Sequence, residues 1–358
     1  MLIVRSPVRI SFAGGGTDLP TYYEQFGGAV LSMAINKYFY TILGKRSDGR
    51  IQVISSDLRI FETWRDIATM DIKGSGLEIP LAVLKELGCD ISVDLFLASE
   101  IPPGTGLGSS ASVCVNMLKT VTSYLQMHLS KHDLAERAFH IARNVLGRHV
   151  GKQDEYAAAF GGLNFITFDR DGTADVTPLD LAPDALNEFQ SNLMLFFTGS
   201  AHHSWTILEE QEKSTRSQSS SATRALHDVY RLAQQMREAL EKNEFHRVGV
   251  LLDDAWNAKK RVSARISTTR IDRLYEVARQ NGALGGKITG AGGGGFLLLY
   301  CEPQRQADVR RALAAEQVQE MAFASDNNGA QILANDPFID NDASVGSRWT
   351  FVPTTSFR

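Results

Sequence analysis

Apolar residues in the first half of the chain occur in short runs, separated by the turn-forming residues glycine, aspartate and asparagine. Short apolar runs with turn signals at both ends predict β-strands. The predicted strands cover residues 10–13, 29–33, 38–43, 51–55, 91–97 and 163–168. Between the last two strands the apolar spacing becomes that of an amphipathic helix, over 110–125 and again over 133–146. The first half therefore mixes strands with helices.

The second half of the chain has a mainly helical pattern. Prolines and aspartates interrupt the apolar pattern at 178–190, and we expect a domain boundary there, between a first domain at 1–185 and a second at 190–333. The elements predicted for the second domain are strands at 193–197 and 296–300 and helices at 222–240, 245–256 and 271–280. The Ser- and Thr-rich stretch 214–223 is either a loop or the polar start of a helix. Residues 334–358, rich in polar residues, are expected to form a loosely attached tail.

Composition and charge place the chain among ordinary soluble globular proteins. Of its 358 residues 43% are apolar and 22% are charged, which suits one large or two medium domains. A net charge of −4 and a pI near 6.1 favour neither nucleic acid nor an anionic membrane as a partner. Basic residues cluster only locally, and we interpret these clusters as solvated faces. They are Lys259, Lys260 and Arg261, and Arg310 with Arg311.

Cysteine usage and the lack of long apolar runs indicate a cytoplasmic protein. Cys89, Cys114 and Cys301 are an odd number without the spacing of a metal site, so we expect free thiols in a reducing compartment. The N-terminus lacks the apolar run of a signal peptide, and no stretch approaches the ~20 apolar residues of a membrane span.

The first of two glycine-rich segments, PPGTGLGSSAS at 102–112, leads directly into the helix predicted at 110–125. Glycine allows a positive φ and lets backbone N–H groups approach an anion closely, and the start of a helix favours a phosphate group. The spacing fits neither a Walker P-loop nor a dinucleotide-binding fingerprint. We interpret the segment as a phosphate-binding loop in which Ser109 or Ser110 caps the helix or contacts Mg²⁺. The alternative is an ordinary loop before a capped helix.

The second glycine-rich segment, GGKITGAGGGG at 285–295, leads into the apolar strand predicted at 296–300. Each ordered glycine costs about 0.5–1 kcal/mol relative to alanine, and a structural hairpin needs only one or two of them. Four in succession at 292–295 favour a close approach of the backbone to a ligand. Two such loops on one chain suggest a polyphosphate held between two parts of the protein.

Two further segments place a carboxylate beside glycines. In PVRISFAGGGTD at 7–18, a strand ends in three glycines, and Asp18 either caps the next turn or accepts hydrogen bonds from sugar hydroxyls. In GKQDEYAAAFGG at 151–162, small residues surround Asp154, whose local pattern alone favours a cap or surface acid over a catalytic base.

Together these four segments resemble the GHMP kinase family, named for galactokinase, homoserine kinase, mevalonate kinase and phosphomevalonate kinase. Residues 7–18, 103–112 and 287–296 are similar to its three motifs, in order. AGGGTD at 13–18 and QDEYAAAFGG at 153–162 look most like the D-glycero-D-manno-heptose 7-phosphate kinase branch, which also contains fucokinase-like relatives. The resemblance implies an α+β protein of two domains, a ribosomal-protein-S5-domain-2-like N-terminal half and a ferredoxin-like C-terminal half, with the active site between them.

The resemblance also implies roles for residues by their position in the motifs. It makes the chain an ATP- and Mg²⁺-dependent kinase that phosphorylates the anomeric hydroxyl of D-glycero-D-manno-heptose 7-phosphate or a similar sugar. The sequence leaves the oligomeric state open, with a homodimer as one option. Asp154 is implied to deprotonate the hydroxyl, and Arg9 to lie near the transferred phosphate. The residues implied to hold ATP are Pro103, Gly104, Thr105, Gly106, Leu107, Gly108, Ser109, Ser110 and Ala111, with Ser110 as the metal contact. Those implied to hold the sugar are Gly15, Gly16, Thr17, Asp18, Gly292, Gly293 and Gly294.

The chain departs from the family pattern in two places. The family usually has a Mg²⁺-binding glutamate twelve residues before the catalytic aspartate, where this chain has Ala142. Heptose kinases tend to have an arginine shortly after the strand at 193–197, where this chain has His202 and His203. Either change fits a different sugar, as in a fucokinase-like enzyme, slower turnover, or a nucleotide- or sugar-binding protein that has lost catalysis. The sugar-like first motif argues against non-transferase chemistry.

Overall fold

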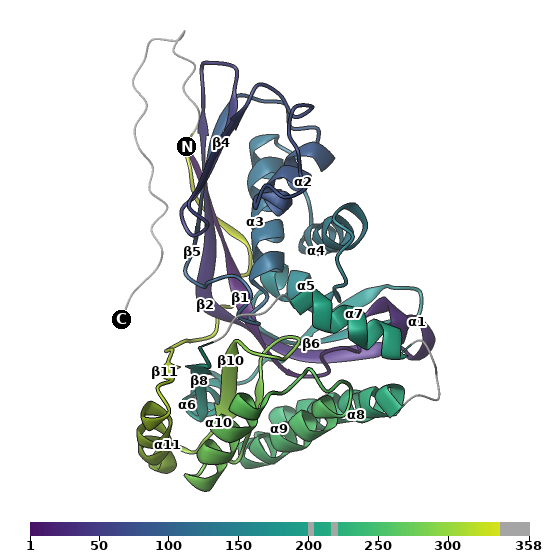
Figure 1. Ribbon diagram of the computed structural model, residues 1–358, viewed down its shortest axis with the longest axis vertical. Helices are drawn as coiled ribbons and strands as arrows, with labels where there is room; N and C mark the ends of the chain where they lie inside the picture. The colour runs from purple at the N-terminus through teal and green to yellow at the C-terminus, as the bar shows by residue number, and fades with distance from the viewer. Residues whose placement is uncertain (200–203, 216–220, 337–358) are drawn as a thin grey trace.

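The larger of two β-sheets organises the N-terminal half of the molecule (Figure 1). The computed structural model describes residues 1–199, 204–215 and 221–336. The eight strands of the larger sheet, within these residues, are β1 (Leu2–Ala13), β2 (Gly28–Lys45), β3 (Ile51–Ser55), β4 (Ile60–Trp64), β5 (Val93–Ser99), β6 (Leu163–Phe168), β7 (Ala174–Pro178) and β12 (Gln331–Asn335). Their order is β12-β1-β2-β5-β3-β4, and β6 pairs with both β2 and β7. Strands β3 and β5 are parallel, and the other paired strands are antiparallel.

The two long strands β1 and β2 form the centre of this sheet, and β12, β5 and β6 pair with them. The prediction of two separate strands at 29–33 and 38–43 is wrong, because both segments belong to β2. Asn36 and Lys37 interrupt the apolar pattern, but β1 pairs with β2 on both sides of them. A register shift directly after Pro7 of β1 absorbs the two extra residues. The first part of β2 then pairs with β6 and its last part with β5, so one strand spans the sheet.

Helices cover one face of the larger sheet (Figure 1). They are α2 (Glu78–Glu86), α3 (Ser109–Tyr124), α4 (Lys131–His140) with the π-helical turn η1 (Ile141–Val145), and α5 (Gln153–Phe160), while α1 (Pro20–Phe26) follows β1. Val115, Leu118 and Val121 of α3 are fully buried in the core beneath the sheet. The helix predicted at 133–146 is α-helical only to His140, because the chain then widens into η1.

A smaller antiparallel sheet forms the C-terminal half. Its strands are β8 (Leu193–Phe197), β9 (Gly285–Ile288), β10 (Phe296–Tyr300) and β11 (Gln319–Glu320), in the order β11-β8-β10-β9. The helices of this half are α6 (Pro183–Ser191), α7 (Ser204–Thr215), α8 (Ser221–Glu241), α9 (Phe245–Lys260), α10 (Thr269–Gln280) and α11 (Pro303–Ala315). One apolar core joins the halves: the ring of Phe12 in β1 lies 5.5 Å from Phe189 in α6, which lies 5.8 Å from Phe245 in α9. The two halves are therefore packed against each other along this part of their junction.

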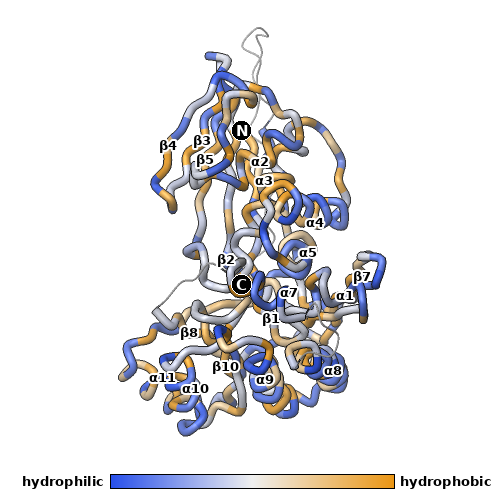
Figure 2. The backbone as a smooth tube through the Cα atoms, turned by 45° about the vertical axis from the view of Figure 1, so that its right-hand side comes forward, coloured by the Kyte–Doolittle hydropathy of each residue, from blue (hydrophilic) through white to orange (hydrophobic). Residues whose placement is uncertain are grey.

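The two sheets and the helices packed with them confirm the α+β prediction. Figure 2 shows hydrophobic backbone (orange) in strands and along helices, and hydrophilic backbone (blue) at turns and on the outer helices. Among the described residues no helix combines the length and apolar character needed to cross a bilayer. The three cysteines are free and buried, as expected.

Three sequence expectations fall partly or wholly outside the described residues. In the stretch 214–223, α7 ends at Thr215 and α8 begins at Ser221, and 216–220 are not described. Of the expected tail, residues up to Asn335 pair with β1 as part of β12, and 337–358 are not described. His202 and His203 also lie outside the described residues.

Candidate active site

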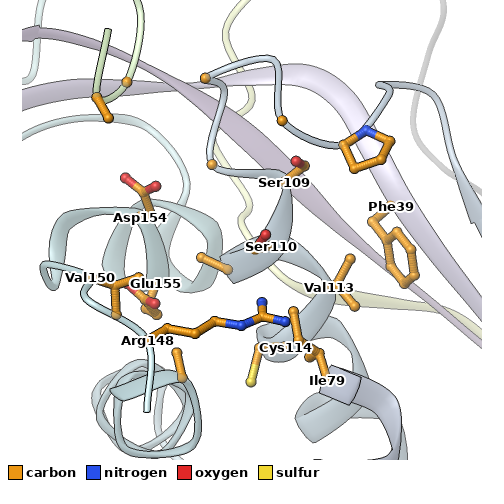
Figure 3. Close-up of a pocket in the computed structure, with 18 of the residues that line it drawn as sticks. Phe39, Ile79, Ser109, Ser110, Val113, Cys114, Arg148, Val150, Asp154 and Glu155 are labelled. Atoms are coloured by element: carbon orange, nitrogen blue, oxygen red, sulfur yellow. The ribbon is translucent and has the colours of Figure 1, made fainter. Parts of the chain in front are cut away.

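A cavity of about 490 Å³ lies where the N-terminal half meets the second glycine loop (Figure 3). The loop after β1, the loop before α3 and the start of α5 give it polar walls. The second half contributes Leu208, Lys259, Gly290 and Ala291. A separate apolar wall comes from side chains that include Phe39, Leu77, Ile79, Leu97 and Val113. A cavity with one apolar wall and one glycine-rich polar wall suits a ligand with an aromatic and an anionic end.

The first glycine loop presents its backbone to this cavity. Gly104, Gly106 and Gly108 have φ values of 77°, 80° and 76°, which favour glycine. Gly108 is the N-cap of α3 and has no side chain, so the prediction that Ser109 or Ser110 caps the helix is wrong. Both serines lie in the first turn of α3 and line the cavity (Figure 3). The start of α3 is therefore free to bind an anion.

The two glycine loops contact each other directly, although they are far apart in the sequence. A Cβ added to Gly106 would lie 2.4 Å from the carbonyl oxygen of Thr289, and one added to Gly290 would lie 2.8 Å from Cα of Gly106. The N–H of Phe296 donates to the carbonyl of Thr105 at 3.2 Å. This contact requires glycine because the backbones of the two loops touch and leave no room for a side chain.

Arg9 and Asp154 form an ion pair beside the first glycine loop. Arg9, on β1, donates from Nε to Oδ1 of Asp154 at 2.8 Å, and its Nη2 lies 2.5 Å from the same oxygen. Its Nη1 donates to the carbonyl of Gly106 at 2.7 Å. Asp154 stands in the first turn of α5, and its Oδ2 lies on the side of Gly108. One guanidinium thus fixes the carboxylate relative to the loop.

Asp18 lines the cavity beside the start of α5 and is buried. Its Oδ1 accepts from the N–H of Gly16 at 2.7 Å, and its Oδ2 from the N–H of Gln153 at 3.3 Å. Burial raises the pKa of this carboxyl above its ordinary value, and the nearby charge of Asp154 adds to the effect. The two N–H donors act in the opposite direction. The helix that follows Asp18 has Leu19 as its N-cap and no side-chain cap, so the interpretation of Asp18 as a cap of the next turn is wrong.

Lys259 reaches this part of the cavity from the second half. Its Nζ donates to the carbonyl of Gly15 at 2.7 Å and to Oε1 of Gln211 at 3.1 Å. Burial lowers its pKa to about 8. The interpretation of this basic cluster as a solvated face is therefore wrong for Lys259, because the end of α9 turns its side chain inward while its neighbour Lys260 is partly exposed.

Glu155, next to Asp154, is a buried carboxyl that the motif comparison did not single out. It lines the cavity, and its Oε2 has no hydrogen-bond partner among the described residues. Burial raises its pKa well above the ordinary value, and the charge of Asp154 adds to this. Arg148 also lines the cavity (Figure 3). Its Nη2 lies 2.5 Å from Oε2 of Glu78. Ala142 lines the cavity as well.

The structure brings most, but not all, of the expected site residues to the cavity. Those that line it are Arg9, Gly15, Gly16, Asp18, Pro103, Gly104, Gly106, Gly108, Ser109, Ser110, Ala111 and Asp154. Those that do not are Thr17, Thr105, Leu107, Gly292, Gly293 and Gly294. Thr17 is buried and donates to the carbonyls of Gly14 and Ala29, which shapes the loop. Gly293 donates to the carbonyl of Ile266, so this part of the glycine run packs within the second half.

Comparison with known families agrees with this arrangement. Residues 77–162 match the family described as GHMP kinases N terminal domain, and residues 236–319 match GHMP kinases C terminal. The first match includes the glycine loop and Asp154, and the second includes Lys259 and Gly290.

Individual relatives extend over nearly the whole chain. The D-glycero-alpha-D-manno-heptose 7-phosphate kinase of Campylobacter jejuni is 31% identical over 329 residues, which are 90% of this chain and 96% of that protein. The crystal structure of a D-glycero-D-manno-heptose 1-phosphate kinase from Bacteroides thetaiotaomicron is similar with a TM-score of 0.77 and 28% identity, covering 94% of this chain and 100% of that one. The L-fucokinase/L-fucose-1-P guanylyltransferase of Bacteroides fragilis is 26% identical over 86% of this chain but only 35% of its own length. With its glycine loops, Arg9 and Asp154 gathered at one cavity, the chain belongs to the GHMP kinase family of ATP-dependent phosphotransferases and is a sugar kinase.

Proposed function

We propose that this kinase transfers the γ-phosphate of ATP to the anomeric hydroxyl of D-glycero-D-manno-heptose 7-phosphate, a step toward nucleotide-activated heptose for surface polysaccharide. The observation that carries the proposal is the Arg9–Asp154 pair, which sets a carboxylate against the first glycine loop inside the cavity. The similarity to the heptose 7-phosphate kinase over almost the full length of both chains supports the choice of substrate. A cytoplasmic location and a homodimer stay predictions from the sequence.

The first glycine loop and the start of α3 are the proposed site for the ATP phosphates. The N–H groups of Ser109, Ser110 and Ala111 precede the first intrahelical bond, which Ser112 donates to Gly108, and sit at the positive end of the helix dipole. Gly106 lets the second glycine loop pack against the first, because a Cβ there would lie 2.4 Å from the carbonyl oxygen of Thr289. The apolar wall that includes Phe39, Ile79 and Val113 is the proposed site of the adenine ring.

The residues present also fit a Mg²⁺ ion. Mg²⁺ prefers oxygen ligands and usually takes only one or two from the protein, with substrate phosphates and water completing the shell. Ser110 offers a hydroxyl in the cavity, and Glu155 offers a carboxylate oxygen that has no hydrogen-bond partner within the described part of the chain. Ala142 offers no ligand. The bound ion would neutralise charge on the phosphates.

In the proposed reaction Asp154 accepts the proton of the sugar hydroxyl as the hydroxyl oxygen bonds to the γ-phosphorus and the bond to the bridging oxygen of ADP breaks. Arg9 holds one carboxylate oxygen, so the other is available to the acceptor. The backbone N–H groups of the glycine loop balance the charge on the phosphoryl oxygens. Positioning and charge stabilisation supply most of the rate in such transfers.

A second candidate, a kinase of an unphosphorylated sugar such as fucose, rests on the charges of the cavity. Each described basic side chain that lines the cavity already has an acidic neighbour. Arg9 is paired with Asp154, Arg148 with Glu78, and Lys259 is attracted to Asp18. A phosphorylated acceptor would have to compete with these partners.

ADP release in the presence of ATP and Mg²⁺ over a panel of free and phosphorylated sugars separates the candidates. Turnover on the heptose 7-phosphate, with kcat/KM at least tenfold above that on any free sugar, is the expected result. Turnover confined to free sugars would refute the choice of substrate. ATP binding without turnover on any acceptor would instead point to a protein that has lost catalysis.

A further inference from the structure

A side chain from the second half enters the first motif of the N-terminal half. Lys259, at the end of α9, places Nζ 2.7 Å from the carbonyl of Gly15 and 3.1 Å from Oε1 of Gln211 on α7. The amide Nε2 of Gln211 in turn donates to the carbonyl of Gly16 at 3.4 Å. Lys259 and Gln211 are both buried. Gln211 therefore fixes the ammonium group against the Gly15–Gly16 loop.

Glycine at position 16 makes this approach possible. A Cβ added to Gly16 would lie 2.3 Å from Nε2 of Gln211 and 3.0 Å from Nζ of Lys259. The chain thus keeps this loop free of side chains at the point where the second half contacts it. The contact joins the two halves at the edge of the cavity.

Both hydrogen-bond donors and hydrogen-bond acceptors lie beside the Gly15–Gly16 loop. Each carboxylate oxygen of Asp18 accepts one N–H from the residues that the structure describes, and a carboxylate has room for further donors. Gln153 lines the cavity, and its Oε1 is buried without a hydrogen-bond partner among the described residues. An ammonium group has three donors, of which Lys259 uses two on Gly15 and Gln211. One donor and several acceptors are left for a ligand.

This set of groups suits hydroxyls better than a phosphate. The charge of Lys259 is attracted to that of Asp18, so this ammonium group does not face a ligand as an isolated positive charge. A phosphate dianion would also be repelled by the buried carboxylate of Asp18. Neighbouring hydroxyls of a sugar can accept from the ammonium and donate to the carboxylate or the amide oxygen.

We propose that Lys259 is a substrate-binding residue that donates a hydrogen bond to a ring hydroxyl of the acceptor sugar opposite Asp18, and that Gln211 positions it. The proposal rests on the proposed function only in taking the acceptor to be a sugar. It extends the acceptor site beyond the N-terminal half, because Lys259 and Gln211 come from α9 and α7.

Replacement of Lys259→Met keeps the length and apolar stem of the side chain and removes the donor. The acceptor KM should rise about 10- to 100-fold, as for loss of a hydrogen bond to a charged group. The KM for ATP should stay within about twofold, because the proposed phosphate site is the first glycine loop at 102–112, whereas Lys259 contacts the Gly15–Gly16 loop. Lys260→Met, on the same helix, is the control and should leave both constants unchanged. An unchanged acceptor KM in Lys259→Met, or an equal rise in both KM values, would overturn the proposal.

The test of Gln211 must separate a positioning role from a general loss of stability. Gln211→Leu should raise the acceptor KM less than Lys259→Met does, with kcat and the ATP KM little changed. In the double variant it should add almost nothing to the effect of Lys259→Met, because both act through one ammonium group. Fully additive effects would refute the positioning role.

Direct measurement of acceptor binding tests the role of Lys259 even if a variant is inactive or the proposed sugar is not the substrate. Calorimetric titration with the heptose 7-phosphate, without ATP, gives the acceptor affinity, and thermal unfolding shows whether each variant is folded. If the native enzyme prefers another sugar, the same comparison is made with that sugar, and the proposed substrate fails while the role of Lys259 is still tested. Equal affinity of native and folded Lys259→Met protein for the preferred sugar would reject the role.

Discussion

Arg9 contacts a single oxygen of Asp154 twice, through Nε at 2.8 Å and Nη2 at 2.5 Å, and leaves the other oxygen on the side of Gly108. The same guanidinium donates to the carbonyl of Gly106. The proposed base and the proposed phosphate loop are therefore held by one side chain from β1. A shift of the first glycine loop would therefore also move the carboxylate of Asp154. The predictions for Asp154 and Gly106 concern the two sides of this contact.

Asp154→Asn should lower kcat about 10²- to 10⁴-fold, the usual contribution of a general base. The amide keeps the size of the side chain but cannot accept a proton. ATP affinity, measured by titration, should change less than about threefold, because the backbone of the glycine loop is unaltered. Asp180→Asn, an exposed residue away from the cavity, is the control. Retention of native kcat in Asp154→Asn would remove Asp154 from the mechanism.

Gly106→Ala should weaken ATP binding by about tenfold or more and lower the free energy of unfolding. A Cβ there would lie 2.4 Å from the carbonyl of Thr289, and the φ of +80° adds strain of about 1–2 kcal/mol for alanine. Gly74→Ala is the matched control, because Gly74 has a φ of +77° and no atom within 4 Å of an added Cβ.

Urea unfolding and ATP titration of both glycine variants separate strain from contact. In both variants the strain of alanine at positive φ should lower the free energy of unfolding. Only in Gly106→Ala should this free energy fall further and ATP bind less tightly. Equal losses in the two variants would show that the contact between the glycine loops is unimportant.

Glu155→Gln should weaken divalent-metal binding in the presence of nucleotide by several-fold, because glutamine has the same shape but carries no negative charge. Ala142→Glu should strengthen it, since position 142 also lines the cavity. Ala142→Gln, of equal length and without charge, is the control for the second variant. Electron paramagnetic resonance of bound Mn²⁺ measures the affinity independently of turnover. Unchanged Mn²⁺ affinity in Glu155→Gln would exclude Glu155 as a ligand.

The parts of the site that the sequence predicted are those in which local conformation demands a particular residue. The first glycine loop needs positive φ at three alternate positions, and Arg9 and Asp154 stand in recognisable motifs. Lys259 could not be found in this way, because it acts on Gly15, 244 positions away. The only local signal was a basic cluster, which gave no indication of which lysine turns inward.

The fold was predicted best where the apolar pattern was uninterrupted, as in α3 and in β8, whose bounds agree within one residue with the predicted 110–125 and 193–197. It was predicted worst where tertiary pairing overrides the local pattern. The polar pair Asn36 and Lys37 lies within β2 as a bulge, because β1 pairs with β2 on both sides of it. The short edge strand β12 has no pattern of its own and forms by pairing with β1.

The buried lysines near the junction should make stability rise with pH in the alkaline range. Burial and the nearby charges of Lys259 and Arg9 lower the pKa of Lys287 to about 7, while its ordinary value is 10.5. Asp18 acts in the opposite direction, and Nζ donates to the carbonyl of Ser11. Between these two pKa values the unfolded chain binds more protons than the folded one, so the free energy of unfolding increases with pH. The slope from one such lysine is at most about 1.4 kcal/mol per pH unit.

Lys287→Met should therefore flatten the dependence of the unfolding free energy on pH between about 7 and 9.5. Lys259, with a pKa of about 8, adds a second contribution of the same sign that stays in this variant. The range ends below pH 10 because buried tyrosines such as Tyr156, whose pKa burial raises above 10, begin to lose their stabilising contribution there. Urea unfolding at intervals of half a pH unit measures the slope, with Lys260→Met as the exposed control. Parallel curves for the native protein and Lys287→Met would mean that Lys287 remains charged in the folded state across the whole range.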